Sequence, residues 1–172
     1  MSRPDLTHVV ENGIETFVSD TYFDGYPLLD YWRFNESGFF FHRRLSSGDG
    51  EDKPLADIGF TVTYVAEAID CLTRLYTELI AEDQAIAVVL RLLATNGRRL
   101  TRLPPHMPLI SLYESVIPEI VIEKRNSLAE WRAGLQDHTV DICKEIFLRF
   151  NWINANLELA KEIIHKLFTR SW

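Results

Sequence analysis

Residues 56–82 carry the clearest periodic signal in the chain, and it predicts one long helix. Apolar residues recur there every three to four positions, while charged residues such as Glu67 and Arg74 lie off that stripe. Asp57 stands where an N-cap carboxylate is needed. The apolar stripe comprises Ile58, Val62, Val65, Ile69, Leu72, Tyr76, Leu79 and Ile80. A helix of this kind packs its stripe against other elements, so the rest of the chain must supply a sheet or further helices.

Strand signals lie on both sides of this helix. Residues 6–19 and 31–45 each read as a hairpin, the first around Asn12-Gly13 and the second around residues 35–38. Residues 85–93 are a short apolar run without alternation, which favours a central strand buried on both faces. A turn at Asn96-Gly97 then predicts a second strand, so residues 91–102 are expected to form a hairpin. Residues 116–124 predict one more strand.

Helix signals dominate the C-terminal third. Ser127 and Glu130 have capping-box spacing before a short helix with Trp131. Asp137 is expected to cap a helix that runs to about Phe150, and Asn154 or Asn156 a final one. The element order predicts an α+β fold, with one mostly antiparallel sheet, a long helix after the first strands and two to three C-terminal helices. We expect a single domain over residues 1–172, with a flexible acidic loop at about 46–54.

The charge of the chain is unevenly spread. Its 172 residues carry a net charge of −7, with −10 in residues 1–90 and +3 in residues 91–172. A strongly basic nucleic-acid binder is therefore not the expected class, although a local basic face is compatible with these numbers. Cys71 and Cys143 lie in apolar patterns and favour buried free thiols in the cytoplasm. The N-terminus lacks a signal-peptide pattern, and no apolar run is long enough to span a membrane.

Catalytic and metal-binding motifs do not emerge from the pattern. There is no nucleophile elbow, P-loop or dinucleotide fingerprint, and no cofactor is expected. His138, Asp141 and Cys143 come nearest to a ligand cluster, but Asp141 at a helix start is better explained as a dipole partner. His42 could act as an acid or base only with a partner that the sequence does not place, so a hydrolase using His42 or His138 is the least favoured hypothesis.

The aromatic strand of residues 31–45 has two readings. Trp32, Phe34 and residues 39–41 could stack on bases of single-stranded nucleic acid, aided by Arg33, Arg43 and Arg44. The favoured reading is that these residues build a sheet core. Alternation places Phe39 and Phe41 on one face and Phe40 and His42 on the other, so both faces of the strand need cover.

The predicted hairpin 91–102 contains four arginines, Arg91, Arg98, Arg99 and Arg102. Strand alternation divides Arg98 and Arg102 from Arg99, so they do not converge on one phosphate cradle. A charged sheet edge that blocks aggregation explains them most simply. An anionic ligand, nucleic acid or an acidic protein partner are the alternatives.

Four segments together resemble a known family. They are "YWRFNESGFFFHRRL", the helix with "YVAEAIDCLTRLY", "LRLLATNGRRL" and "EIFLRFNW". Over about residues 30–169 the chain resembles the C-terminal region of bacterial Schlafen/AlbA-type putative DNA-binding proteins. The sequence shows no counterpart of the N-terminal AlbA-type domain, the presumed nucleic-acid module of that family, so DNA binding is not expected to carry over. The resemblance implies a companion module that serves a larger prokaryotic assembly, regulatory or defence-related.

We therefore expect a non-enzymatic accessory subunit that binds another protein or a second copy of itself, without membrane attachment. The expected contact residues are aromatic anchors with arginines at the rim. They are Trp32, Phe40, Arg98, Arg99, Trp152 and Trp172. The alternative is a nucleic-acid or phosphate-binding module built on the arginine-rich hairpin 91–102. Its expected contacts are Arg43, Arg44, Arg98, Arg99 and Arg102.

Overall fold

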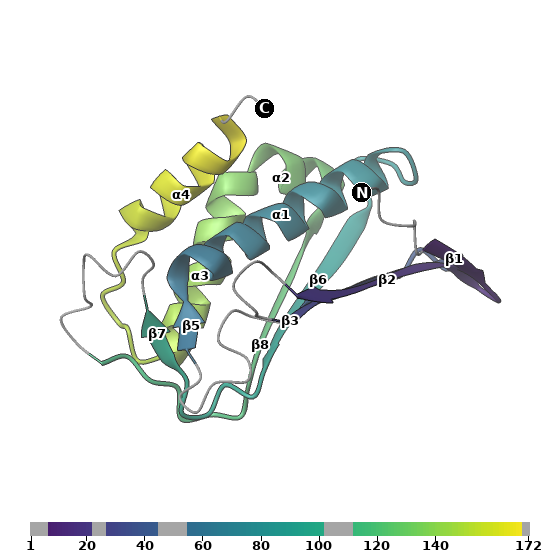
Figure 1. Cartoon of the computed structure of the whole chain (residues 1–172). Helices are drawn as coiled ribbons and strands as arrows, with labels where there is room; N and C mark the ends of the chain where they lie inside the picture. The colour runs from purple at the N-terminus through teal and green to yellow at the C-terminus, as the bar shows by residue number, and fades with distance from the viewer. Residues whose placement is uncertain (1–6, 22–26, 45–54, 102–111, 170–172) are drawn as a thin grey trace. The chain divides into compact units, whose positions relative to one another are not determined.

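The computed structural model describes residues 7–21, 27–44, 55–101 and 112–169, and it confirms the α+β class (Figure 1). The chain divides into two compact units, residues 1–49 and residues 50–172. The first holds a four-stranded antiparallel sheet, and the second holds the long helix, two small sheets and the C-terminal helices. A single domain over the whole chain stays a prediction. The expected loop at 46–54 lies outside the described residues.

The N-terminal unit is an antiparallel meander. Its strands, in sheet order, are β1 (Thr7–Val10), β2 (Gly13–Thr21), β3 (Pro27–Asn35) and β4 (Phe40–Arg44). Both predicted hairpin turns are present, and Gly38 at φ +80° closes the second by donating its N–H to the Asn35 carbonyl at 2.9 Å. Glycine is required at position 13, because a Cβ there would lie 2.0 Å from the Phe34 carbonyl oxygen.

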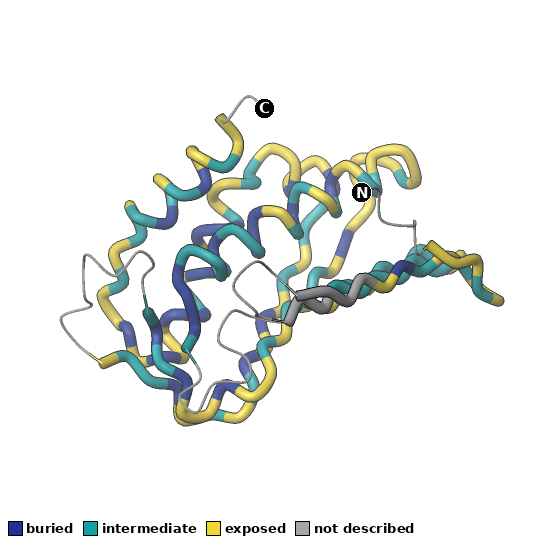
Figure 2. Tube along the Cα trace, in the orientation of Figure 1, coloured by how far each residue is buried: buried dark blue, intermediate teal, exposed yellow. Residues whose placement is uncertain are grey.

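The predicted long helix is α1 (Ile58–Thr77), and strand β5 (Leu55–Asp57) leads into it. Asp57 is the N-cap, as predicted, and its Oδ1 accepts the Phe60 N–H at 2.5 Å. Val62, Val65 and Ile69 are buried where α1 packs on α3, and Figure 2 shows the buried side of α1 along its length. The helix ends at Thr77, so the last predicted turn, with Leu79 and Ile80, lies beyond it.

Strand β6 (Ala85–Leu93) was expected to be buried on both faces, and that prediction is wrong. β6 pairs antiparallel with β8 (Glu119–Ser127), and in the described residues these two strands form a sheet of their own. Ile86, Ile120 and Ile122 are buried on the inner face, whereas Val89 and Leu93 are exposed on the other. A short apolar run does not show whether a second layer covers the strand, which is why the pattern misled.

The prediction that residues 91–102 form a hairpin is also wrong. Ala94 adopts φ 53°, and the chain leaves the β6 direction at this left-handed residue. The segment that follows pairs with residues 113–118 instead: the Gly97 N–H donates to the Ser115 carbonyl and the Leu100 N–H to the Tyr113 carbonyl. Strand β7 (Arg99–Thr101) also pairs in parallel with β5. The predicted turn at Asn96-Gly97 does exist, with Gly97 at φ +77°.

Three helices complete the C-terminal unit: α2 (Leu128–Ala133), α3 (Leu135–Arg149) and α4 (Leu157–Thr169). The predicted capping box at Ser127 and Glu130 is formed. Helix α3 starts two residues before Asp137, so the prediction that Asp137 is its cap is wrong, and this residue lies in the first turn. Asn156 caps α4, because its Oδ1 accepts the Glu158 N–H at 3.1 Å. The largest fully buried side chains are Trp131, Phe147 and Phe150.

Candidate interaction surfaces

The arginines of residues 91–102 are engaged inside the chain wherever they are described. Arg98 is 8% exposed, and its Nε donates to the Ala94 carbonyl at 2.8 Å. Arg99 Nε lies 2.8 Å from Glu114 Oε2, and Arg91 Nε lies 3.2 Å from Glu119 Oε1. Arg102 falls outside the described residues. Arg91, Arg98 and Arg99 thus each have a partner within the fold.

Trp32 and Phe40 lie together on one face of the N-terminal sheet, with ring centroids 6.4 Å apart. His42 shares this face, which we call the His42 face, and its Nε2 lies 2.8 Å from Asp30 Oδ1. Arg44 Nε is 3.6 Å from the other oxygen of the same carboxylate. The imidazole thus contacts the Asp30 carboxylate, and its ring centroid lies 6.4 Å from that of Phe40, so it links β3 and β4.

The remaining predicted anchors and ligands occupy structural positions. Trp152 is 8% exposed and packs between Tyr113 and Phe147, with centroids 5.2 and 5.3 Å away. His138 Nε2 lies 3.0 Å from the Glu130 carbonyl oxygen, and its ring lies 4.6 Å from that of Trp131. Trp172 is outside the described residues. Within the described ranges, no group of three or more His, Cys, Asp or Glu side chains is placed to hold a metal ion.

The two cysteines differ in exposure. Burial raises the pKa of the Cys143 thiol to about 12, so it stays protonated at neutral pH. Cys71 is exposed, contrary to the expected burial of both thiols, although partial desolvation and then the Asp70 carboxylate raise its pKa too. Neither environment favours a thiolate nucleophile.

The opposite face of the N-terminal sheet is more open. Phe17, Tyr31 and Phe41 lie on it with Arg33 and Arg43, and we call this the Phe41 face. Phe17 is 44% and Phe41 42% exposed, and Arg43 is exposed as well. Tyr31 and Phe41 have ring centroids 6.0 Å apart. The alternation in β4 was predicted from the sequence, whereas Phe17 and Tyr31 were not, although the same two-residue period places them on this face.

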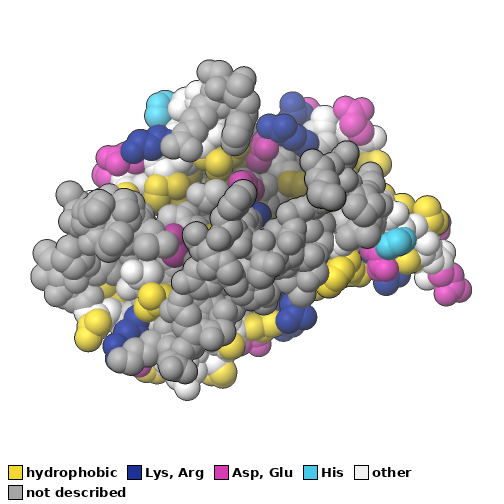
Figure 3. Space-filling model, in the orientation of Figure 1, with side chains coloured by type: hydrophobic (Ala, Val, Ile, Leu, Met, Phe, Trp, Pro, Cys, Tyr) yellow, Lys and Arg dark blue, Asp and Glu magenta, His cyan; other side chains and the backbone are white. Residues whose placement is uncertain are grey.

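A second open surface is the outer face of the β6–β8 ladder. Val89, Leu93 and Val121 are 53%, 54% and 43% exposed on it. Val121 lies opposite Arg91 in the register, and therefore diagonal to both Val89 and Leu93. We call these residues, with the charged residues between them, the β6–β8 outer face. In Figure 3, hydrophobic and charged side chains lie next to one another on the described part of the surface.

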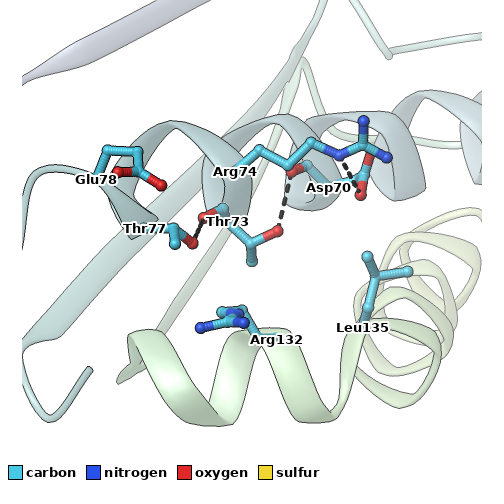
Figure 4. A pocket seen from close by; sticks show the side chains of 7 residues that line it. All are labelled: Asp70, Thr73, Arg74, Thr77, Glu78, Arg132 and Leu135. Carbon is cyan, nitrogen blue, oxygen red and sulfur yellow. Dashed lines mark hydrogen bonds and ion pairs between the residues drawn. The ribbon is translucent and has the colours of Figure 1, made fainter. Parts of the chain in front are cut away.

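A polar cleft of about 430 Å³ lies between α1 and the helices α2 and α3. Figure 4 shows Arg132 and Leu135 opposite the α1 side chains Asp70, Thr73 and Thr77. Its polar groups bind one another: Arg74 Nη2 is 3.0 Å from Asp70 Oδ2, and the threonine hydroxyls donate to helix carbonyls. Arg132 forms an ion pair with Glu82 at 2.6 Å. Asp70, Arg74, Arg132 and the two threonines of the cleft thus have partners within the chain.

The Phe41 face yields a prediction on ionisation. The Tyr31 hydroxyl donates to Glu15 Oε2 at 2.9 Å, and this hydrogen bond raises the pKa of Tyr31 above its ordinary value of 10.0. Glu15→Gln should lower that pKa toward the ordinary value, because both the carboxylate acceptor and its charge are lost. A pH titration of ¹³C-labelled tyrosine by NMR measures this. An unchanged Tyr31 pKa in the variant would show that the contact is not formed in solution.

No described helix has the length and apolarity that a membrane crossing requires. Comparison of the chain with protein families, with curated proteins and with solved structures gave no match. The function must therefore be argued from the surfaces themselves.

Proposed function

We propose that the chain is a non-enzymatic accessory subunit, and that it binds another protein through the β6–β8 outer face. The observation that carries this proposal is the cluster of three exposed apolar side chains on two strands, in which Val121 is the diagonal neighbour of both Val89 and Leu93. Single exposed apolar residues are common on protein surfaces, whereas adjoining ones mark interaction sites.

Charged residues of both signs lie between and beside these apolar side chains. Arg91 and Glu119 form an ion pair beside Val121 and Leu93. Glu123 lies opposite Val89, and Arg125 follows two positions further along β8. Apolar and charged residues therefore alternate on this face, with Arg91 between Val89 and Leu93 and Val121 between Glu119 and Glu123. A mixed surface of this kind matches a non-obligate protein interface, which as a whole is about as polar as the rest of a protein surface. The partner in this proposal is a protein subunit, with a second copy of the chain as the simplest version.

Two further observations support a binding role. The resemblance to the C-terminal region of Schlafen/AlbA-type proteins implies a companion module in a larger assembly, at work in the cytoplasm. Among the described titratable groups, His42 and His138 contact structural partners and Cys143 is held as a neutral thiol. The alternative of phosphate or nucleic acid at residues 91–102 is less favoured, because Arg98 is buried and the charge of Arg99 is paired with the Glu114 carboxylate.

The test is affinity capture of proteins from a lysate of the organism that encodes the chain. Tagged wild type is compared with Val121→Glu and Leu93→Glu, which place a charge in the apolar cluster. Leu79→Glu is the matched control, because Leu79 is 52% exposed but follows α1 and does not belong to the ladder. A partner should be lost from both ladder variants and kept by the control. Light scattering of the purified chain shows whether that partner is a second copy. Equal capture by all four proteins would refute the proposed surface.

A further inference from the structure

On the Phe41 face, aromatic rings and arginines are paired across neighbouring strands. Phe17 on β2 lies opposite Tyr31 on β3, and Tyr31 in turn lies opposite Arg43 on β4. Arg33 lies opposite Phe41 in the next pair on the same face. The three rings thus cross three neighbouring strands, each about 4.8 Å from the next. The two guanidinium groups lie beside the rings rather than in a separate patch.

Carboxylates are few on this face of the described sheet. Among the described residues of β2, the acidic one on the Phe41 face is Glu15, which lies opposite Arg33. Its Oε2 accepts the Tyr31 hydroxyl at 2.9 Å, so part of its hydrogen-bonding capacity is used within the face. Arg33 Nε donates to Asn35 Oδ1 at 2.8 Å, which holds the side chain over the sheet. Among its described residues, the face therefore carries two arginines and one carboxylate.

We propose that the Phe41 face binds single-stranded nucleic acid. The ligand that matches rings interleaved with guanidinium groups must carry both planar apolar rings and negative charge. Unpaired bases supply the rings and phosphates the charge, and base–aromatic stacking on a sheet is an established mode of recognition. A duplex fits poorly, because its base faces are stacked inside. A sheet face with three rings suits two or three bases.

This inference goes beyond the proposed function and is independent of it, because the Phe41 face belongs to residues 1–49 and the β6–β8 outer face to residues 50–172. The overall charge of −7 opposes polyanion binding, so affinity should be modest and highest at low ionic strength. With Arg33 and Arg43 as the two phosphate contacts, log K should fall with log salt concentration with a slope of about −1.4.

Fluorescence anisotropy tests the proposal with labelled oligo(dT) and oligo(U) of about 12 nucleotides, and with a duplex of equal length. Adjacent residues in β4 provide matched pairs. Phe41→Leu should weaken binding of the single strands about tenfold, because a stacking ring is lost. Phe40→Leu is the same change on the His42 face and should leave affinity within about twofold. Arg43→Gln should weaken binding and flatten the salt dependence, whereas Arg44→Gln should not. Circular dichroism of each variant confirms that the sheet is intact.

The results that would overturn the proposal are equally specific. They are absence of oligonucleotide binding at low salt, tighter binding to the duplex than to the single strands, or equal effects of Phe41→Leu and Phe40→Leu. Loss of a captured protein in Phe41→Leu, without any oligonucleotide binding by the wild type, would assign the face to a protein partner instead. Val121→Glu should not alter the anisotropy, so a failure here is distinct from a failure of the proposed docking surface.

Discussion

Trp131→Ala is expected to lower the free energy of unfolding of the C-terminal unit by about 3–5 kcal/mol. Trp131 is fully buried on α2, and its Nε1–H donates to the Ile86 carbonyl on β6 at 3.2 Å. The side chain thus joins the short helix to the β6–β8 ladder, and truncation removes both a large apolar volume and a buried hydrogen bond. Far-UV circular dichroism during urea denaturation measures this unit, because all the described helices belong to it.

Trp131→Phe separates the two contributions. It keeps most of the ring packing and loses the indole N–H, so it should cost less than the alanine variant. A loss below about 1 kcal/mol for Trp131→Ala would mean that α2 does not pack on the ladder as described.

Phe147→Ala should cost about 3–5 kcal/mol as well. Phe147 is 1% exposed on α3, and its ring lies 5.3 Å from that of Trp152. Leu148→Ala is the matched control on the same helix, since Leu148 is 40% exposed, and it should cost less than about 1 kcal/mol. The same urea titration compares the two variants. Similar losses for both would show that α3 is rotated relative to this structure.

Local signals predicted the elements well. Asp57, the Ser127–Glu130 capping box and the glycines at positions 13, 38 and 97 act through neighbours a few residues away, so their roles are readable from the sequence. The long helix followed from its apolar stripe, because helix packing requires such a stripe. The pairing of strands could not be predicted from the local sequence. β6 meets β8 and the segment after Ala94 meets residues 113–118, and neither partner is marked in the local pattern.

The candidate binding surfaces could not be predicted from local sequence signals either. Aromatic residues were expected to be anchors, yet Trp152 is buried, and Trp32 packs beside Phe40 on the half-buried His42 face. Arg98 was expected at a rim, but the left-handed turn at Ala94 brings its side chain back to a carbonyl. Exposed residues such as Val89 and Val121 are of the same apolar type as core residues, so the residue type alone does not distinguish them. Which face of a strand stays uncovered depends on tertiary packing, and a single sequence does not contain that information in readable form.

The proposed function depends on the binding of a protein partner to the β6–β8 outer face. Isothermal titration calorimetry of the purified partner against the full chain tests it most directly. Val121→Glu should weaken that binding at least thirtyfold, equivalent to about 2 kcal/mol, because a carboxylate would replace the apolar side chain that neighbours both Val89 and Leu93 in the interface. Leu79→Glu should change it less than twofold. Equal affinity of the Val121→Glu variant and the wild type would contradict the account.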